Sequence, residues 1–202
     1  MNVDCAARPL VAFCLALLLA ACGTSSSTSD NVDSRSGVTT TPVAADRDGA
    51  IYRQEIPVAV TGDTMVVQVF EPTHLVVGKS YPLVLQGHGY GGSRETTAPD
   101  GSFIKRLNDA GYYVISIDER GFGESSGTVR VMDPEYEGQD LIAVLDWAEN
   151  LEGLRRRNNG EMMVGSYGGS YGGMYQVLLY AVDPKHRLRV LAPDITPHDL
   201  TY

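Results

Sequence analysis

Three things are scarce in this sequence, and each scarcity narrows what the protein can be. Cysteine occurs three times in 202 residues, at positions 5, 14 and 22, which leaves no pair for a disulfide beyond residue 22. Lys and Arg are outnumbered by Asp and Glu, which gives a net charge of -9. This charge argues against nucleic acid as a partner, because phosphate binding requires clustered Lys and Arg. The apolar run at residues 10–21 is shorter than the ~20 residues of a membrane-spanning helix.

The N-terminal segment has the pattern of a secretion signal followed by a lipid attachment site. The apolar run follows Arg8 and is typical of the h-region of a signal peptide. It ends in Leu-Ala-Ala-Cys, which resembles the lipobox of bacterial lipoproteins, in which the cysteine is lipidated and becomes the first mature residue. We expect residues 1–21 to be a lipoprotein signal peptide and Cys22 to anchor the protein by lipid to a membrane of the bacterial cell envelope. An ordinary secreted protein with an incidental cysteine is the alternative.

The rest of the chain divides into a polar segment and a folded domain. Residues 22–50 are rich in Ser, Thr and Asp and predict a flexible tether, whereas residues 51–202 predict a folded domain. Two apolar runs around Thr61-Gly62-Asp63 predict an antiparallel hairpin. From Pro82 onward strands and helices alternate, which predicts an α/β fold with a mainly parallel sheet and helices on both faces. The expected strands after the hairpin are 81–86, 112–118, 161–166 and 187–193, and the expected helices are 102–110, one between Pro134 and residue 154, and 170–182.

The stretch GSYGGSYGG at residues 165–173 repeats Ser-Tyr-Gly-Gly and contains one full match to Gly-x-Ser-x-Gly. Ser170 has a glycine two residues before and two after it, whereas Ser166 is preceded at that distance by Val164. Glycine at these positions lets the backbone pass through a tight turn from strand to helix, the nucleophile elbow, without a Cβ clash. We therefore expect Ser170 to be a nucleophile and the backbone N–H of Tyr171 to face a developing oxyanion.

Two further loops follow expected strands. His88-Gly89-Tyr90-Gly91 stands where hydrolases with such an elbow place their second oxyanion donor, and the backbone amide of Tyr90 is the best candidate. The position of His88 favours a structural hydrogen bond over the role of a base. Residues 118–127 alternate glycine with charged residues, which suits a turn stabilised by an Arg–Asp bond. Asp118 precedes Ser170, which is the wrong order for the acid of this triad.

Together these segments resemble the α/β-hydrolase fold, specifically the Xaa-Pro dipeptidyl-peptidase-like (S15, cocaine-esterase-related) family. The resemblance rests on HGYGGS, DERGFGESSG, DPEYEGQDLIAVLDWAEN and GGSYGG, and covers roughly Ile51 to the end of the chain. It implies Ser170 as the nucleophile and Tyr90 and Tyr171 as oxyanion donors, and it leaves open whether Tyr90 contributes its amide, its phenol or neither. No cofactor and no metal ion are expected.

The histidine and the carboxylate that such a serine requires are hard to find in this sequence. In this fold both follow the nucleophile, where the only histidines are His186 and His198. His186 lies beyond the far end of the helix, more than ~15 Å away at ~1.5 Å per residue, and is excluded. Asp194 and His198 stay open, but the family places its acid and base after further strands. We therefore expect a fragment whose hydrolase fold is truncated after about the sixth strand.

The sequence thus predicts a serine hydrolase of peptidase or esterase type that acts on a small ester or peptide substrate through an acyl-Ser170 intermediate. Without its acid and base, this chain alone is expected to be nearly inactive. One alternative is a non-catalytic or decayed hydrolase-fold envelope lipoprotein. Another is an acyltransferase that passes the acyl group to an alcohol.

Overall fold

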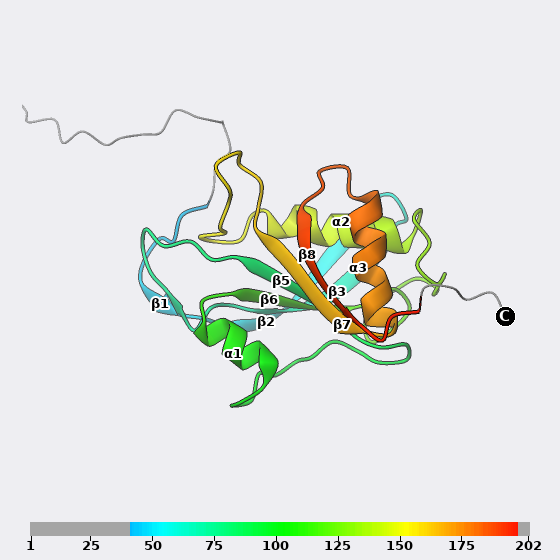
Figure 1. Ribbon diagram of the computed structural model, residues 1–202, viewed down its shortest axis with the longest axis horizontal. Helices are drawn as coiled ribbons and strands as arrows, with labels where there is room; N and C mark the ends of the chain where they lie inside the picture. The colour runs from blue at the N-terminus through cyan, green and yellow to red at the C-terminus, as the bar shows by residue number, and fades with distance from the viewer. Residues whose placement is uncertain (1–40, 198–202) are drawn as a thin grey trace, which may run out of the picture. The chain divides into compact units, whose positions relative to one another are not determined.

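A six-stranded sheet lies at the centre of the part of the chain that the computed structural model describes, residues 41–197. Its strands lie side by side in the order β2-β3-β6-β5-β7-β8 (Figure 1). Their bounds are β2 (Ile51–Val58), β3 (Asp63–Phe70), β5 (Leu83–Gly87), β6 (Tyr113–Asp118), β7 (Val164–Gly169) and β8 (Leu188–Asp194). From β6 across to β8 all neighbouring strands are parallel, which confirms the mainly parallel sheet predicted from the sequence.

The antiparallel part of the sheet begins with the predicted hairpin. β2 and β3 pair from Ile51 opposite Phe70 to Val58 opposite Asp63. At the turn, the N–H of Gly62 donates to the carbonyl of Val58 at 2.8 Å, and Gly62 has a φ of 75°, a conformation that glycine adopts without strain. β3 then pairs antiparallel with β6, which joins the hairpin to the parallel strands.

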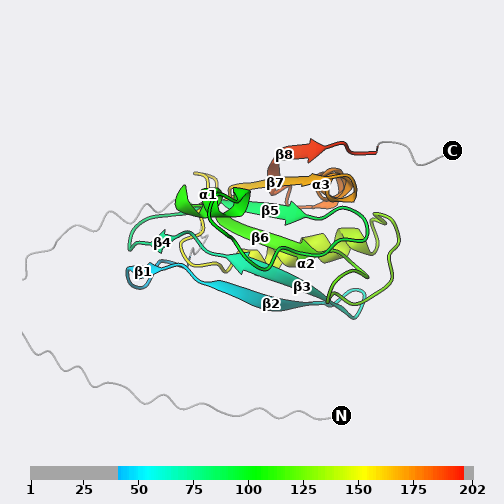
Figure 2. The same cartoon turned by 90° about the horizontal axis from the view of Figure 1, so that it is seen from below.

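Helices cover both faces of the sheet. Figures 1 and 2 show α2 (Glu137–Ala148) and α3 (Tyr171–Val182) together on one face and α1 (Phe103–Asp109) on the other. All six residues of β6 are buried, and alternate ones face opposite ways. Val114 packs with Ile104 of α1, while Ile115 belongs to the larger core under α2 and α3. The continuous apolar run of β6 is therefore explained by cover on both faces.

Strand β7 starts later and ends later than the sequence predicts. Residues 161–163 turn back on 155–157, where the N–H of Arg157 donates to the carbonyl of Glu161 at 2.7 Å and that of Met163 to Arg155 at 2.9 Å. The carbonyl of Met163 accepts the N–H of Leu83 of β5 at 2.9 Å. Pairing with β5 consequently begins at Val164. The predicted strand 161–166 is shifted by three residues, because a short apolar run can form a local β-bridge as well as a strand of the sheet.

Ordered structure precedes Ile51, the start of the fold expected from the sequence. β1 (Arg47–Asp48) pairs with β4 (His74–Leu75), and Val43 is buried in the main core. Arg47 donates to Glu71 at 3.0 Å and to Glu152 at 2.9 Å. Charge pairs with distant residues, rather than apolar periodicity, hold this segment, so the sequence pattern did not reveal it. The signal peptide, most of the tether and Cys22 lie outside the described residues.

Strand β8 is the outer strand of the sheet on the α3 side. It pairs only with β7 among residues 41–197, and Val190 on it is 63% exposed. In the same described range, none of the helices has the length and apolar character needed to cross a membrane.

Candidate active site

Ser170 lies at the sharp turn between β7 and α3. Its φ of 55° and ψ of -119° are a backbone conformation that non-glycine residues rarely adopt and that stores strain. Its carbonyl accepts the N–H groups of Gly173 at 2.8 Å and Met174 at 3.1 Å, while its own N–H donates to the carbonyl of Asp194 at 2.9 Å. The strained residue is thus fixed from α3 and from β8, as a strand-to-helix elbow requires.

The glycines around Ser170 are required by the backbone that surrounds them. A Cβ on Gly168 would lie 2.5 Å from the carbonyl oxygen of Gly172 and 2.7 Å from that of Gly87. A Cβ on Gly172 would lie 2.4 Å from the oxygen of Gly87 and 2.8 Å from that of His88. These are backbone atoms of β5, of the segment after it and of α3, so a side chain at either position would have to push whole segments apart. The two glycines let the first turn of α3 pack directly on the end of β5.

Ser166, the serine of the other Ser-Tyr-Gly-Gly copy, has different surroundings. It lies inside β7, is 3% exposed, and its hydroxyl donates to Gln176 of α3 at 3.0 Å. The sequence placed it at the end of a strand, but the strand continues to Gly169. Only Ser170 of the two stands at the turn.

The glycine-rich segment after β5, residues 87–92, lies against the start of α3. The carbonyls of Gly87 and His88 face Gly172, and the N–H of Gly92 donates to the carbonyl of Gly89 at 2.9 Å, closing a turn around Tyr90. The Tyr90 side chain is 67% exposed, and its ring stands edge-on to that of Tyr171, 5.4 Å between centroids. The ring of Tyr90 therefore lies beside the residue that directly follows Ser170. Because the sequence predicts an oxyanion donor in residues 87–92, we call them the oxyanion loop from here on.

Tyr171 follows Ser170 directly and is the first residue of α3. Its backbone N–H belongs to the first helical turn, where amides have no carbonyl partner within the helix and can bind an anion. Its side chain is 3% exposed, and burial raises the pKa of its phenol, which keeps the group neutral. The sequence prediction for Tyr171 concerns its backbone N–H, and the position at the start of α3 suits that role.

His88 is engaged on both ring nitrogens. Its Nδ1 is 2.8 Å from the carbonyl of Gly89, to which it donates, and its Nε2 accepts the N–H of Glu119 at 3.1 Å. The ring is 7% exposed and packs edge-on against Phe122. A neutral imidazole satisfied in this way holds the oxyanion loop in place and has no nitrogen left to take a proton from Ser170, in line with the structural role favoured by the sequence.

The charged segment after β6 forms two separate Arg–Asp pairs. The buried Asp118 binds Arg94 through its side chain and through the Arg94 N–H at 2.6 Å. Arg120 binds Asp140 of α2 in a two-pronged contact at 2.7 and 2.6 Å, and it also pairs with Asp63. The predicted turn is thus stabilised by Arg–Asp bonds, but Arg94 was missed because it lies 24 residues before its partner and no local pattern marks it.

The acids and histidines that follow Ser170 in the chain are spread over several places. Asp183 is buried and bound to Arg187, and His186 is exposed beyond the far end of α3, so its exclusion stands. Asp194 reaches the elbow through its backbone carbonyl, with its side chain at the surface. His198 lies outside the described residues. Among residues 41–197, no hydrogen bond joins a histidine ring to the Ser170 hydroxyl.

Residues 61–202 match the family model described as X-Pro dipeptidyl-peptidase (S15 family). The chain belongs to this family. This S15-family chain is similar to the uncharacterized 31.7 kDa protein in the traX-finO intergenic region of Escherichia coli, with 34% identity over 93 residues. The aligned segment covers 46% of this chain and 30% of that protein. It is also similar to the lysophosphatidylserine lipase ABHD12 of Xenopus tropicalis, with 36% identity over 78 residues. That segment covers 39% of this chain and 19% of the lipase. The matches thus span less than a third of these curated relatives.

The solved structures show the fold of the S15-family chain. The alpha/beta hydrolase GrgF from Penicillium sp. sh18 matches with a TM-score of 0.50 at 18% identity, over 71% of this chain and 46% of that one. The α/β-hydrolase fold predicted from the sequence is therefore confirmed. At this identity the likeness concerns the fold and carries no information on substrate.

Proposed function

We propose that the chain carries the nucleophile and oxyanion hole of a serine hydrolase that cleaves an ester or peptide bond through an acyl-Ser170 intermediate. The observation that carries the proposal is the strained turn at Ser170, closed by two obligatory glycines against the end of β5. Strain of this kind persists only where the surrounding structure enforces it, and it concentrates at reactive residues. Membership of the S15 family supports hydrolysis as the reaction class.

The proposed reaction has two halves. The Ser170 Oγ attacks the carbonyl carbon of the substrate and gives its proton to a base, while the carbonyl oxygen becomes an oxyanion. When that intermediate collapses, the alcohol or amine leaves with a proton and the acyl group stays on Ser170. Water then attacks the acyl-serine through a second oxyanion, which releases the acid and restores the hydroxyl.

The oxyanion would be held between α3 and the oxyanion loop. The backbone N–H of Tyr171 is at the positive end of the α3 dipole, and the amide of Tyr90 is in the turn that packs beside it. Removing one such donor from a comparable site costs a factor of roughly 10² to 10³ in kcat. Because both proposed donors are backbone groups, side-chain replacement of Tyr90 tests its ring and phenol rather than its amide.

The base is proposed to come from outside the described residues, and the acid either from there or from Asp194. Within residues 41–197 the ring of His88 is fully engaged and His186 is remote, which supports this view. Asp194 and His198 stay open, and a longer protein would supply an acid and a base from strands beyond β8. Esterase and peptidase activity are both compatible with the elbow.

Replacing Ser170 by alanine is expected to lower ester hydrolysis by the full-length protein by a factor of roughly 10⁴ to 10⁶, because the acyl intermediate can no longer form. Activity would be followed with a chromogenic short-chain ester and with an Xaa-Pro peptide. The matched control is Ser166→Ala, which removes a buried hydrogen bond at a cost of about 1 kcal/mol but leaves the elbow intact. Wild-type turnover in Ser170→Ala would contradict the proposal, and no turnover or acylation in any form would favour a non-catalytic scaffold.

We further propose that Cys22 carries a lipid that holds the protein at a bacterial membrane. The support is the sequence Leu-Ala-Ala-Cys-Gly after an apolar run, in residues 19–23. Expression in a bacterium with labelled palmitate is expected to label the wild type and Cys14→Ser, whose cysteine lies within the signal peptide. Cys22→Ser is expected to carry no label. Equal labelling of Cys22→Ser and wild type would contradict lipidation at this residue.

A further inference from the structure

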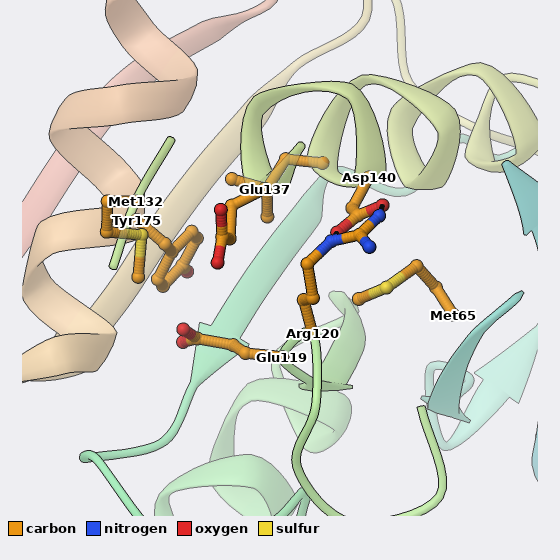
Figure 3. A pocket seen from close by; sticks show the side chains of 8 residues that line it. Met65, Glu119, Arg120, Met132, Glu137, Asp140 and Tyr175 are labelled. Atoms are coloured by element: carbon orange, nitrogen blue, oxygen red, sulfur yellow. Dashed lines mark hydrogen bonds and ion pairs between the residues drawn. The ribbon is translucent and has the colours of Figure 1, made fainter. Parts of the chain in front are cut away.

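Glu119 has a buried carboxyl group beside α2 and α3. It directly follows β6, is 4% exposed, and neither of its carboxyl oxygens has a hydrogen-bond partner among the described residues. Figure 3 shows its carboxyl group pointing toward Tyr175 and Glu137, away from the neighbouring Arg120. Buried polar atoms are nearly always satisfied in proteins, so an orphaned carboxyl group of this kind calls for a specific explanation.

The surroundings of Glu119 offer it no positive charge. Arg120, the nearest cation in sequence, is 2% exposed and turned to Asp140 and Asp63. Glu137 adds negative charge, and it is itself occupied by the backbone N–H groups of residues 130 and 133 at 2.6 and 3.0 Å. The remaining wall is mostly apolar, and the cavity of about 10 Å³ that these groups enclose is lined in addition by Met65, Met132, Leu141 and Tyr175.

Glu119 also contacts the oxyanion loop at two points. Its backbone N–H donates to His88 Nε2 at 3.1 Å. Its carboxyl group lies against the first residue of the loop, since a Cβ on Gly87 would be 2.7 Å from Glu119 Oε1 and 2.5 Å from the ring of Tyr175. The carbonyls of Gly87 and His88 also lie against Gly172. The start of the loop is therefore in contact both with Glu119 and with the first turn of α3, two residues from Ser170.

The groups around Glu119 favour its uncharged form. Burial, and secondly the charge of Glu137, raise the pKa of Glu119 well above its ordinary value. Asp140 of α2 brings a further carboxyl group, while Tyr171 and Tyr175 of α3 are phenols whose pKa values burial raises. His88 faces Glu119 as a neutral ring, and the positive charge of Arg120 is taken up by two carboxylates.

We propose that Glu119 is a positioning residue of the oxyanion loop that acts as an uncharged carboxylic acid, so that its ionisation displaces Gly87 and His88 from Gly172. The proposal rests on the proposed function only for the role of the loop, which is to carry an oxyanion donor. A carboxylate cannot stay in an apolar cavity beside Glu137 without solvent or a donor. Because the carboxyl group lies against Gly87 and the Glu119 N–H is bonded to His88, we expect ionisation and loop opening to be coupled.

The coupling gives stability a definite pH dependence. The pKa of Glu119 is raised in the folded state, so the stabilisation is fully present below the ordinary value of about 4.5 and is lost as pH rises toward the folded value. In that window the unfolded chain has released the proton that the folded chain still holds. The folded-to-unfolded ratio of the wild type is expected to fall by up to about tenfold per pH unit relative to Glu119→Gln, which has no proton to lose.

The test uses the full-length wild type, Glu119→Gln, and Glu135→Gln as an exposed control. Infrared difference spectra between wild type and Glu119→Gln are expected to show a protonated carboxylic acid at neutral pH, and hydrogen exchange of residues 87–92 is expected to rise with pH beyond its intrinsic rate in wild type and Glu135→Gln only. If Glu119→Gln does not fold, Glu119→Met serves as the uncharged variant.

Two results would overturn the proposal, and neither depends on Ser170 being a nucleophile. The first is a carboxylate signal for Glu119 at neutral pH. The second is a protonated Glu119 with the same pH dependence of loop exchange in wild type and in the uncharged variants, which would make it a buried acid without a positioning role. Failure of the proposed function would instead show as absent Ser170 chemistry with these two readouts unchanged.

Discussion

Gly172→Ala is expected to be one of the most destabilising single substitutions in this chain. Alanine is favoured over glycine in a helix by about 1 kcal/mol, so propensity alone predicts a gain in stability. The new Cβ, however, would lie 2.4 Å from the carbonyl oxygen of Gly87, and only a shift of α3 away from β5 relieves the contact. We expect a net loss of about 3 kcal/mol or more and, with the oxyanion loop displaced, loss of Ser170 reactivity.

The matched control for this prediction is Gly169→Ala, three residues earlier in the same motif. A Cβ there meets nothing closer than 3.6 Å, the carbonyl oxygen of Asp194. Its cost is expected to stay within about 0.5 kcal/mol, as for substitutions that meet no special feature. Urea unfolding midpoints of the two variants decide the matter. Gly172→Ala at or above wild-type stability would mean that α3 does not pack on β5 as described.

The second large effect is expected from Asp140→Ala. Arg120 and Asp140 are 2% and 1% exposed and joined by two hydrogen bonds that link the segment after β6 to α2. Removing the carboxylate leaves the buried guanidinium with Asp63 as its one carboxylate, beside the hydroxyl of Thr61 at 3.0 Å. Losing one partner of a buried ion pair typically costs about 3–5 kcal/mol. Because α2 lies over the core, the loss should appear as global destabilisation.

The control for Asp140 is Asp109, whose contact with Lys105 is at the surface. The Asp109 side chain is 49% exposed, and solvent screens such i,i+4 pairs strongly. Asp109→Ala is expected to shift the urea midpoint far less than Asp140→Ala. Similar shifts for both would show that burial does not strengthen the Arg120 contact. A loss confined to Asp140→Ala that vanishes in Arg120→Met/Asp140→Leu would identify the unpaired charge as the cause.

The parts of the fold that the sequence predicted are those whose cause is local. The β-branched run of β6 and the glycine-ended pattern of α1 set their own secondary structure, since each depends on neighbours a few residues away. The elbow was equally readable, because the clash that requires Gly168 and Gly172 follows from the turn itself.

What the sequence could not provide are pairings between distant residues. Asp118 binds Arg94 rather than a residue of its own loop, and Arg47 reaches Glu71 and Glu152. Such partners are chosen by tertiary packing, which leaves no periodic signal. Glu119 illustrates the same limit. Its neighbours Asp118 and Arg120 both form ion pairs, whereas the side chain of Glu119 has no partner among the described residues. Nothing in the sequence distinguishes Glu119 from these two neighbours.

The central claim, that Ser170 is the nucleophile, is tested most directly by finding which residue a fluorophosphonate modifies. The full-length protein would be treated with the probe, digested, and the peptide across residues 165–173 sequenced by mass spectrometry. We predict a single phosphonyl group on Ser170, absent in Ser170→Ala and retained in Ser166→Ala. A phosphonyl group on Ser166, or equal labelling of the wild type and Ser170→Ala, would contradict the assignment.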